Sequence, residues 1–188
     1  MNAGAEMRVS ALFSGGKDST YALYVMQQQG WEVASLLTVI PKASDSYMFH
    51  YPNIRWTKLH SEALGIPIKQ RDSSGLKEEE LKDLEELMRS EDTDGFVCGA
   101  IASDYQWSRL NEIAQRLGKI ITVHSIKELE QLREKYRISV TGEGGELETF
   151  VLDGPNFSKE ICILEAHSNW KRNSGNYVIT RAVLEDKK

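Results

Sequence analysis

The sequence predicts an α/β fold in which a five-stranded parallel sheet carries helices on both faces and is followed by a small β-rich C-terminal part. Over the first two thirds of the chain, short β-rich runs alternate with segments of helical periodicity. Parallel strands need long crossover connections, and these crossovers are right-handed and place helices against the sheet. After residue 124 the pattern changes to strand-like runs joined by Gly, Asn, Ser and Pro turns. We therefore expect two domains, residues 1–123 and 124–188.

The elements of the first domain follow one another in a regular rhythm. Residues 8–13 ("RVSALF") form a buried apolar run that predicts the first strand. Residues 19–29 then place four side chains on one helical face before Gly30 ends the helix: Tyr21, Ala22, Val25 and Met26. The same pattern predicts strands at 31–40, 66–70, 95–100 and 119–123, and helices at 53–64, 77–89 and 103–117.

The second domain begins with a predicted helix, residues 125–136 ("SIKELEQLREKY"). Three strand-like stretches follow it, at 137–155, 160–170 and 176–185. We interpret this part as a small β-rich unit.

Composition and charge exclude several classes of protein. With 188 residues, of which 40% are hydrophobic and 27% charged, the chain can bury a core of its own. It has no apolar stretch long enough to span a bilayer, and "MNAGAEM" is not a secretory signal, so we expect a cytoplasmic protein. The net charge of −5 argues against broad nucleic-acid binding. Cys98 and Cys162 stand among apolar residues, which favours reduced thiols over a disulfide or a metal cluster.

The motif "SGGKDS", residues 14–19, lies between the first strand and the first helix. A helix N-terminus at the carboxyl end of a parallel strand offers unpaired N–H groups and a positive dipole end. Gly15 and Gly16 let an anion approach the backbone, and Lys17 adds a cation. A Walker A loop is excluded, because Ala11 and Asp18 stand where that pattern needs Gly and Ser or Thr. The alternative is a tight turn without a ligand.

This motif resembles the pyrophosphate loop of the ATP pyrophosphatase families, with their adenine nucleotide alpha hydrolase-like fold and strand order 3-2-1-4-5. The resemblance implies that ATP adenylylates a substrate oxygen and that pyrophosphate leaves. The loop would then hold the β- and γ-phosphates where charge develops. The residues expected to bind the nucleotide here are Ser14, Gly15, Gly16, Lys17, Asp18 and Ser19. Asp18 is either a ligand of the Mg²⁺ that accompanies ATP or a carboxylate that complements the helix dipole.

Two further stretches are expected near this loop. "GAIASDYQWSR", residues 99–109, leaves the fourth strand and enters a helix with Ser103 as its expected N-cap. In the order 3-2-1-4-5 the first and fourth strands are neighbours, so Gly99 and Ser103 should share the crevice. Arg109 follows about two turns later and is either a substrate ligand or a surface charge. "TGEGGELETFVLDGP", residues 141–155, gathers three carboxylates that are either solvated or face a cation: Glu143, Glu146 and Glu148.

Taken together, "SGGKDS", "SYMFHYPN" (residues 46–53), "GAIASDYQWSR" and "GEGGELETFVLDGP" resemble the diphthine-ammonia ligase family, in that family's order. The resemblance implies conversion of diphthine on translation elongation factor 2 to diphthamide, with ATP and ammonium as co-substrates and AMP and pyrophosphate as products. Adenylylation suits this chemistry, because an anionic carboxylate resists attack by an amine until its charge is removed and a leaving group is supplied.

The implied substrate carries a trimethylammonium group, which aromatic faces or carboxylates hold. The resemblance therefore assigns substrate binding to Tyr47, Phe49, Tyr105, Arg109, Glu143, Glu146 and Glu148, with Tyr51 as a further aromatic face. The expected catalytic residues are Lys17, Asp18, Glu143 and Glu146, because attacking ammonia must be neutral and the glutamates are candidate bases. His50 reads as a hydrogen-bonding residue rather than a catalyst.

One departure from the family pattern lies after the fifth predicted strand. Val123 passes almost directly to "HSIKELEQLREKY", so several tens of residues of the family's pattern are absent. Either this member is naturally shortened, or a mobile segment is missing from this sequence. The expected partners are elongation factor 2 and ammonium, with a homodimer as a further expectation. The alternatives are another enzyme with the same loop, which modifies tRNA or amidates a nucleotide or cofactor, and a non-catalytic nucleotide sensor.

Overall fold

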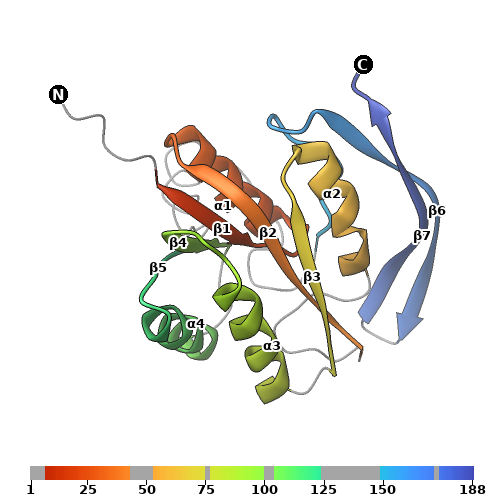
Figure 1. The fold of residues 1–188 in the computed structure, drawn as a ribbon. Helices are drawn as coiled ribbons and strands as arrows, with labels where there is room; N and C mark the ends of the chain where they lie inside the picture. The colour runs from red at the N-terminus through yellow and green to blue at the C-terminus, as the bar shows by residue number, and fades with distance from the viewer. Residues whose placement is uncertain (1–6, 43–52, 75–76, 100–103, 124–148, 172–173) are drawn as a thin grey trace, which may run out of the picture.

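The computed structural model describes residues 7–42, 53–74, 77–99, 104–123, 149–171 and 174–188 (Figure 1). Its main sheet is parallel throughout and has the order β3-β2-β1-β4-β5. The strands are β1 (Arg8–Leu12), β2 (Glu32–Pro41), β3 (Ile68–Ser73), β4 (Gly95–Cys98) and β5 (Ile120–Val123). The predicted fold class and strand order are therefore confirmed.

Helices cover both faces of this sheet, as predicted. They are α1 (Lys17–Gln28), α2 (Thr57–Leu64), α3 (Lys77–Arg89) and α4 (Asp104–Arg116), and a 3₁₀ turn, η1 (Asn53–Trp56), precedes α2. Because side chains alternate along a strand, β1 presents Val9, Ala11 and Phe13 to a core shared with α1, while Leu12 lies against the core on the other face. That second core contains buried side chains of α3 and α4.

Several element boundaries differ from the predicted ones, among them the starts of α1, β3 and α2. Helix α1 begins at Lys17 rather than at residue 19, because Gly16 caps it through the backbone alone. Strand β3 begins at Ile68 rather than at 66, although the Pro67 carbonyl already accepts a hydrogen bond from Leu36. The predicted helix at 53–64 begins with the 3₁₀ turn η1, because the Asn53 side chain bonds to Tyr177 and Ile179 of the C-terminal part instead of capping the helix.

The C-terminal part is a long antiparallel hairpin of β6 (Lys159–Lys171) and β7 (Ser174–Asp186), which lies beside α2 in Figure 1. Ala63 of α2 shares a small core with four buried side chains of the C-terminal part: Phe157, Ile161, Ile179 and Ala182. The expectation of a third strand at 137–155 is wrong for its described portion, since residues 149–155 form none. Their backbone bonds to separate elements instead: the Val151 N–H donates to Gly15, the Val151 carbonyl faces His60, and the Leu152 carbonyl accepts from Ile161 of β6, while Pro155 has no N–H to donate. The predicted helix at 125–136 lies outside the described residues.

A buried polar network joins β1, β2 and the turn before β4, toward the amino ends of the strands. The Ser35 hydroxyl donates to the Glu91 carboxylate at 2.6 Å, and Ser10 donates to the same oxygen at 3.2 Å. Lys69 forms an ion pair with the other Glu91 oxygen. This network lies away from the glycine loop, so it can be altered without touching that loop.

Candidate active site

The glycine loop between β1 and α1 has the geometry of an anion-binding turn. Gly15 has φ +77°, a left-handed conformation that favours glycine, and Gly16 is the N-cap of α1. The Ser19 hydroxyl donates to the Gly16 carbonyl at 3.1 Å and lies 3.2 Å from the Ser14 hydroxyl. The sequence "SGGKDS" thus folds into a turn that is closed by its own serines, at the carboxyl end of β1.

Lys17 and Asp18, the two charged residues of this loop, lie side by side in the first turn of α1. The Lys17 Nζ is 3.1 Å from Asp18 Oδ2, and each side chain is about 30% exposed. A pair this accessible contributes little to folding stability, about 0–1 kcal/mol. Both groups can therefore be reached by a charged ligand at the loop.

The end of β4 packs against the same turn of the helix. A side chain on Gly99 would place its Cβ 2.5 Å from the Asp18 carbonyl carbon and the Ser19 nitrogen, so only glycine fits there. This confirms that the ends of β1 and β4 are neighbours. Arg109 lies further along α4, where it pairs with Glu112 at 3.2 Å and its side chain is 39% exposed. Its expected contact with substrate stays a prediction.

Residues 149–151, which directly follow Glu148 of the acidic motif (Glu143, Glu146 and Glu148) in sequence, lie along the glycine loop. The Lys17 N–H donates to the Thr149 hydroxyl at 2.9 Å, and the Val151 N–H donates to the Gly15 carbonyl at 2.9 Å. The two contacts bridge more than 130 residues of sequence. Sequence reasoning did not single out Thr149, although it is the last residue of "GEGGELET".

His60 of α2 lies under the loop and holds the same segment. Its Nε2 is 2.8 Å from the Val151 carbonyl, and its ring meets Phe13, Phe150 and Phe157 edge to face. The side chain is fully buried. Burial lowers the pKa of His60 to about 4, against the opposing effect of the Val151 and Trp56 carbonyls. The imidazole is therefore neutral at physiological pH.

Comparison with known proteins identifies the family. Residues 7–120 match the diphthamide synthase N-terminal domain, and residues 101–184 match the diphthamide synthase C-terminal domain. The chain belongs to the diphthamide synthase family. Proteins of Bos taurus and Homo sapiens named diphthine–ammonia ligase are each 30% identical to it, over 84% of this chain and 83% of the relative. A Saccharomyces cerevisiae protein of the same name is 24% identical, over 80% of this chain and 33% of the relative.

These alignments also show how this diphthamide synthase family member differs in length. The alignment with the Homo sapiens relative runs over 221 positions, whereas 84% of 188 residues is about 158. Roughly 63 aligned positions therefore have no residue in this chain. Their number is comparable with the several tens of residues that the resemblance leads us to expect after Val123, a location that stays a prediction.

Several residues that we expected to bind the substrate or to act in catalysis lie outside the described residues: Tyr47, Phe49, Tyr51, Glu143, Glu146 and Glu148. Ser103, which we expected together with Gly99 to bind the nucleotide, also lies outside them, as does His50. Tyr105 belongs to α4, but its side chain is not among those described. The structure therefore places the nucleotide side of the expected site, Ser14 to Ser19 with Gly99, and their roles stay predictions.

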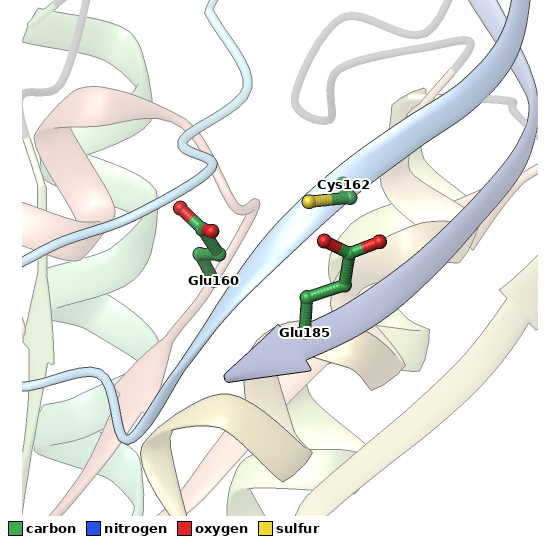
Figure 2. Close-up of side chains that lie close together, drawn as sticks. All are labelled: Glu160, Cys162 and Glu185. Atoms are coloured by element: carbon green, nitrogen blue, oxygen red, sulfur yellow. The ribbon is translucent and has the colours of Figure 1, made fainter. Parts of the chain in front are cut away.

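One group of potential metal ligands occurs among the described residues, on the hairpin. Figure 2 shows Glu160, Cys162 and Glu185, whose ligand atoms lie within 4.8 Å of one another. Burial and the neighbouring Glu185 and Glu160 carboxylates raise the pKa of Cys162, which disfavours the thiolate that binds metals. Both cysteines are free, as predicted. Cys98 is buried and Cys162 is half-buried. Burial raises the pKa of the Cys98 thiol to about 12. This group of potential ligands on the hairpin includes none of the described residues of the glycine loop.

Proposed function

We propose that this chain converts diphthine on translation elongation factor 2 to diphthamide, using ATP and ammonium through an acyl-adenylate. Membership of the diphthamide synthase family makes the chain a diphthamide-forming ligase. In the proposed sequence, a carboxylate oxygen of diphthine attacks the α-phosphorus of ATP and pyrophosphate leaves. Neutral ammonia then attacks the acyl carbon, AMP leaves, and the amide is formed.

The observation that supports this chemistry is the contact between the glycine loop and residues 149–151. It brings the turn suited to phosphates next to the segment that directly follows the acidic motif. The positive end of the α1 dipole and the Lys17 ammonium are the groups that would stabilise departing pyrophosphate. A reaction between a nucleotide and a second substrate needs both parts at one place.

The remaining assignments follow the same proposal. Asp18 fits a Mg²⁺ ion that arrives with ATP, because it offers carboxylate oxygens, partly exposed, at the loop. The acidic motif, Glu143, Glu146 and Glu148, would face trimethylammonium or incoming ammonium, and Tyr47, Phe49 and Tyr105 would contact the substrate. Glu143 and Glu146 are the candidate bases. The protein substrate is elongation factor 2, and we propose a homodimer as the assembled form. Within the described part of the chain, no helix combines the length and apolarity needed to cross a membrane.

The test is formation of AMP and pyrophosphate by the full chain. We expect both products only when ATP, ammonium and diphthine-bearing elongation factor 2 are all present, with amide formation confirmed by mass spectrometry of the factor. Lys17→Met removes the loop cation and should lower the rate about 10²- to 10³-fold, the range for loss of one group aimed at developing charge. Binding of ATP without products from the complete mixture would instead support a nucleotide sensor.

A further inference from the structure

We propose that His60 is a positioning residue, which keeps the glycine loop and residues 149–151 in one fixed arrangement. This inference rests on the proposed function, because it concerns how the two halves of that site are held together. Neither His60 nor Thr149 is needed to explain the identity of the loop, yet both contact it. Their contacts define a unit of four segments: the loop, residues 149–151, the first turn of α2 and the end of β1.

The imidazole of His60 has one defined tautomer. The Val151 carbonyl can only accept a hydrogen bond, so the ring nitrogen 2.8 Å from it, Nε2, carries the proton. The Nδ1 atom is buried and makes no hydrogen bond to any residue that the structure describes. A neutral ring has one N–H, and His60 uses it on residue 151.

The same ring also contacts the glycine loop. A Cβ on Gly15 would lie 2.8 Å from His60 Cε1 and 3.2 Å from Nδ1, so the backbone of the loop rests directly on the edge of the imidazole. The ring itself is fixed by three aromatic neighbours, with centroids 5.3, 4.7 and 5.8 Å away for Phe13, Phe150 and Phe157. One side chain therefore supports Gly15 on one edge and binds Val151 on another.

The position of residues 149–151 is coupled to the backbone of the glycine loop. The Val151 N–H returns a hydrogen bond to the Gly15 carbonyl, and the Thr149 hydroxyl accepts one from the Lys17 N–H. Movement of residues 149–151 away from His60 would therefore change the backbone that is to hold the phosphates. It would also displace the segment through which the acidic motif is joined to the loop. The expected defect is in the step that needs both substrates, more than in binding of ATP alone.

The test compares two substitutions at His60 in the full chain. His60→Phe keeps an aromatic ring but leaves the Val151 carbonyl without a donor, whereas His60→Gln keeps an N–H donor of similar reach. We expect His60→Phe to lower kcat about 10- to 100-fold with a change of less than about threefold in KM for ATP, because a small displacement mainly affects the reacting geometry. His60→Gln should recover most of kcat.

Ser35→Ala is the matched control, because it removes a buried hydrogen bond to Glu91 far from the loop. It should lower thermal stability while kcat of the folded protein stays at the wild-type value. If His60→Phe keeps kcat within about threefold of the wild type, or if Ser35→Ala loses as much, His60 has no positioning role.

Hydrogen exchange separates this inference from the proposed function. In the protein without ligands, His60→Phe should speed exchange of the Val151 amide at least about fivefold, and His60→Gln should not, since only the former frees residue 151. This result is expected even if the wild type makes no AMP from the complete mixture, an outcome that would refute the proposed function alone. Unchanged Val151 exchange in His60→Phe would overturn the inference, whatever the activity.

Discussion

At the scale of single residues, Gly15 and Gly30 share a backbone conformation and differ in their surroundings. Their φ angles are +77° and +81°. A Cβ on Gly15 would meet the His60 ring at 2.8 Å, whereas a Cβ on Gly30 would have no atom within 4 Å. The pair therefore separates the cost of a left-handed backbone from the cost of a steric conflict inside the candidate site.

We expect Gly30→Ala to lower the free energy of unfolding by about 1–2 kcal/mol, the cost of a left-handed L-residue. Gly15→Ala should cost more, because the methyl group also displaces His60, and it should lower the rate of pyrophosphate release. Urea denaturation and the release assay measure the two effects. Equal losses of stability and full activity in both variants would mean that the His60 ring exerts no pressure on the loop.

Glu91 provides a residue-scale prediction about pH. Burial raises the pKa of this carboxyl, but hydrogen bonds from Lys69 and Ser35 outweigh it, and the pKa lies below its ordinary value of 4.5. A carboxyl whose pKa is lower in the folded state stabilises the protein above its unfolded pKa, and that contribution is lost as pH falls through the folded pKa.

Glu91→Gln should therefore be less stable than the wild type near pH 7, by about 1–3 kcal/mol for a buried charged hydrogen bond. The difference in the free energy of unfolding should shrink as pH falls from about 4.5, where the carboxyl of the unfolded chain becomes protonated, through the lower pKa of the folded state. Urea denaturation from pH 7 to pH 3 measures it. A difference that is constant over this range would contradict the depressed pKa.

At the scale of elements, Asn53 completes the edge of a strand. Its amide nitrogen donates to the Tyr177 carbonyl at 2.9 Å, and its oxygen accepts from the Ile179 N–H at 3.0 Å. Trp56 Nε1 adds a bond to the Ile179 carbonyl at 3.0 Å. The side chain thus occupies the place of a neighbouring strand along β7, and it joins the hairpin to the turn before α2.

Asn53→Asp tests this pairing, because aspartate keeps the acceptor for Ile179 but loses the donor for Tyr177. We expect a loss of about 1–2 kcal/mol in the free energy of unfolding and faster hydrogen exchange in β7. Exchange of amides in β1 and β4, the third and fourth strands in the order of the sheet, serves as the internal control. Protection of β7 equal to that of the wild type would show that Asn53 is dispensable there.

The elements that could be predicted are those whose determinants are local. Helix α3 was predicted with its observed bounds, because its apolar side chains recur with helical spacing over 13 residues. The start of α2 and the absence of a strand at 149–155 could not be predicted, because Asn53 and Val151 make their hydrogen bonds to residues more than 90 positions away. Polar side chains and backbone that serve distant partners leave no periodic pattern in sequence.

At the scale of the whole molecule, the hairpin and the sheet domain are joined through α2. Besides the shared apolar core, the Ser158 hydroxyl donates to the Ala63 carbonyl at 2.7 Å, and Asn156 donates to Gln27 of α1 at 2.8 Å. The division of the chain at residue 124 stays a prediction from the sequence pattern. These contacts indicate that the two parts unfold together.

Ile161→Ala tests whether they do. Ile161 is 2% exposed in the core shared with α2, so its truncation should cost about 2–5 kcal/mol. We expect Ile161→Ala to have a single unfolding transition, with the same shift in midpoint whether it is measured by far-UV circular dichroism or by tryptophan fluorescence. Leu164→Ala on the same strand is the control, because Leu164 is 45% exposed and its loss should be small. Two separate transitions would make the hairpin an independent unit.

The candidate site shows a similar limit of prediction. The loop at residues 14–19 could be predicted because its glycines, lysine and serines are contiguous and lie between a strand and a helix. His60 could not, since a histidine inside an amphipathic helix has the same sequence signature whether it fills a core or holds a catalytic loop. Only the packing of Gly15 and Val151 against its ring distinguishes the two cases.

The bridge between Gly15 and Val151 also has a consequence during synthesis. Residues 8–123 can emerge from the ribosome and pair into the parallel sheet while residue 149 is still inside the exit tunnel. Until then the Lys17 N–H has no Thr149 hydroxyl and His60 has no Val151 carbonyl to bind. Contacts this distant in sequence form late in folding. The site should therefore become competent for the reaction only after the C-terminal part of the chain has left the exit tunnel.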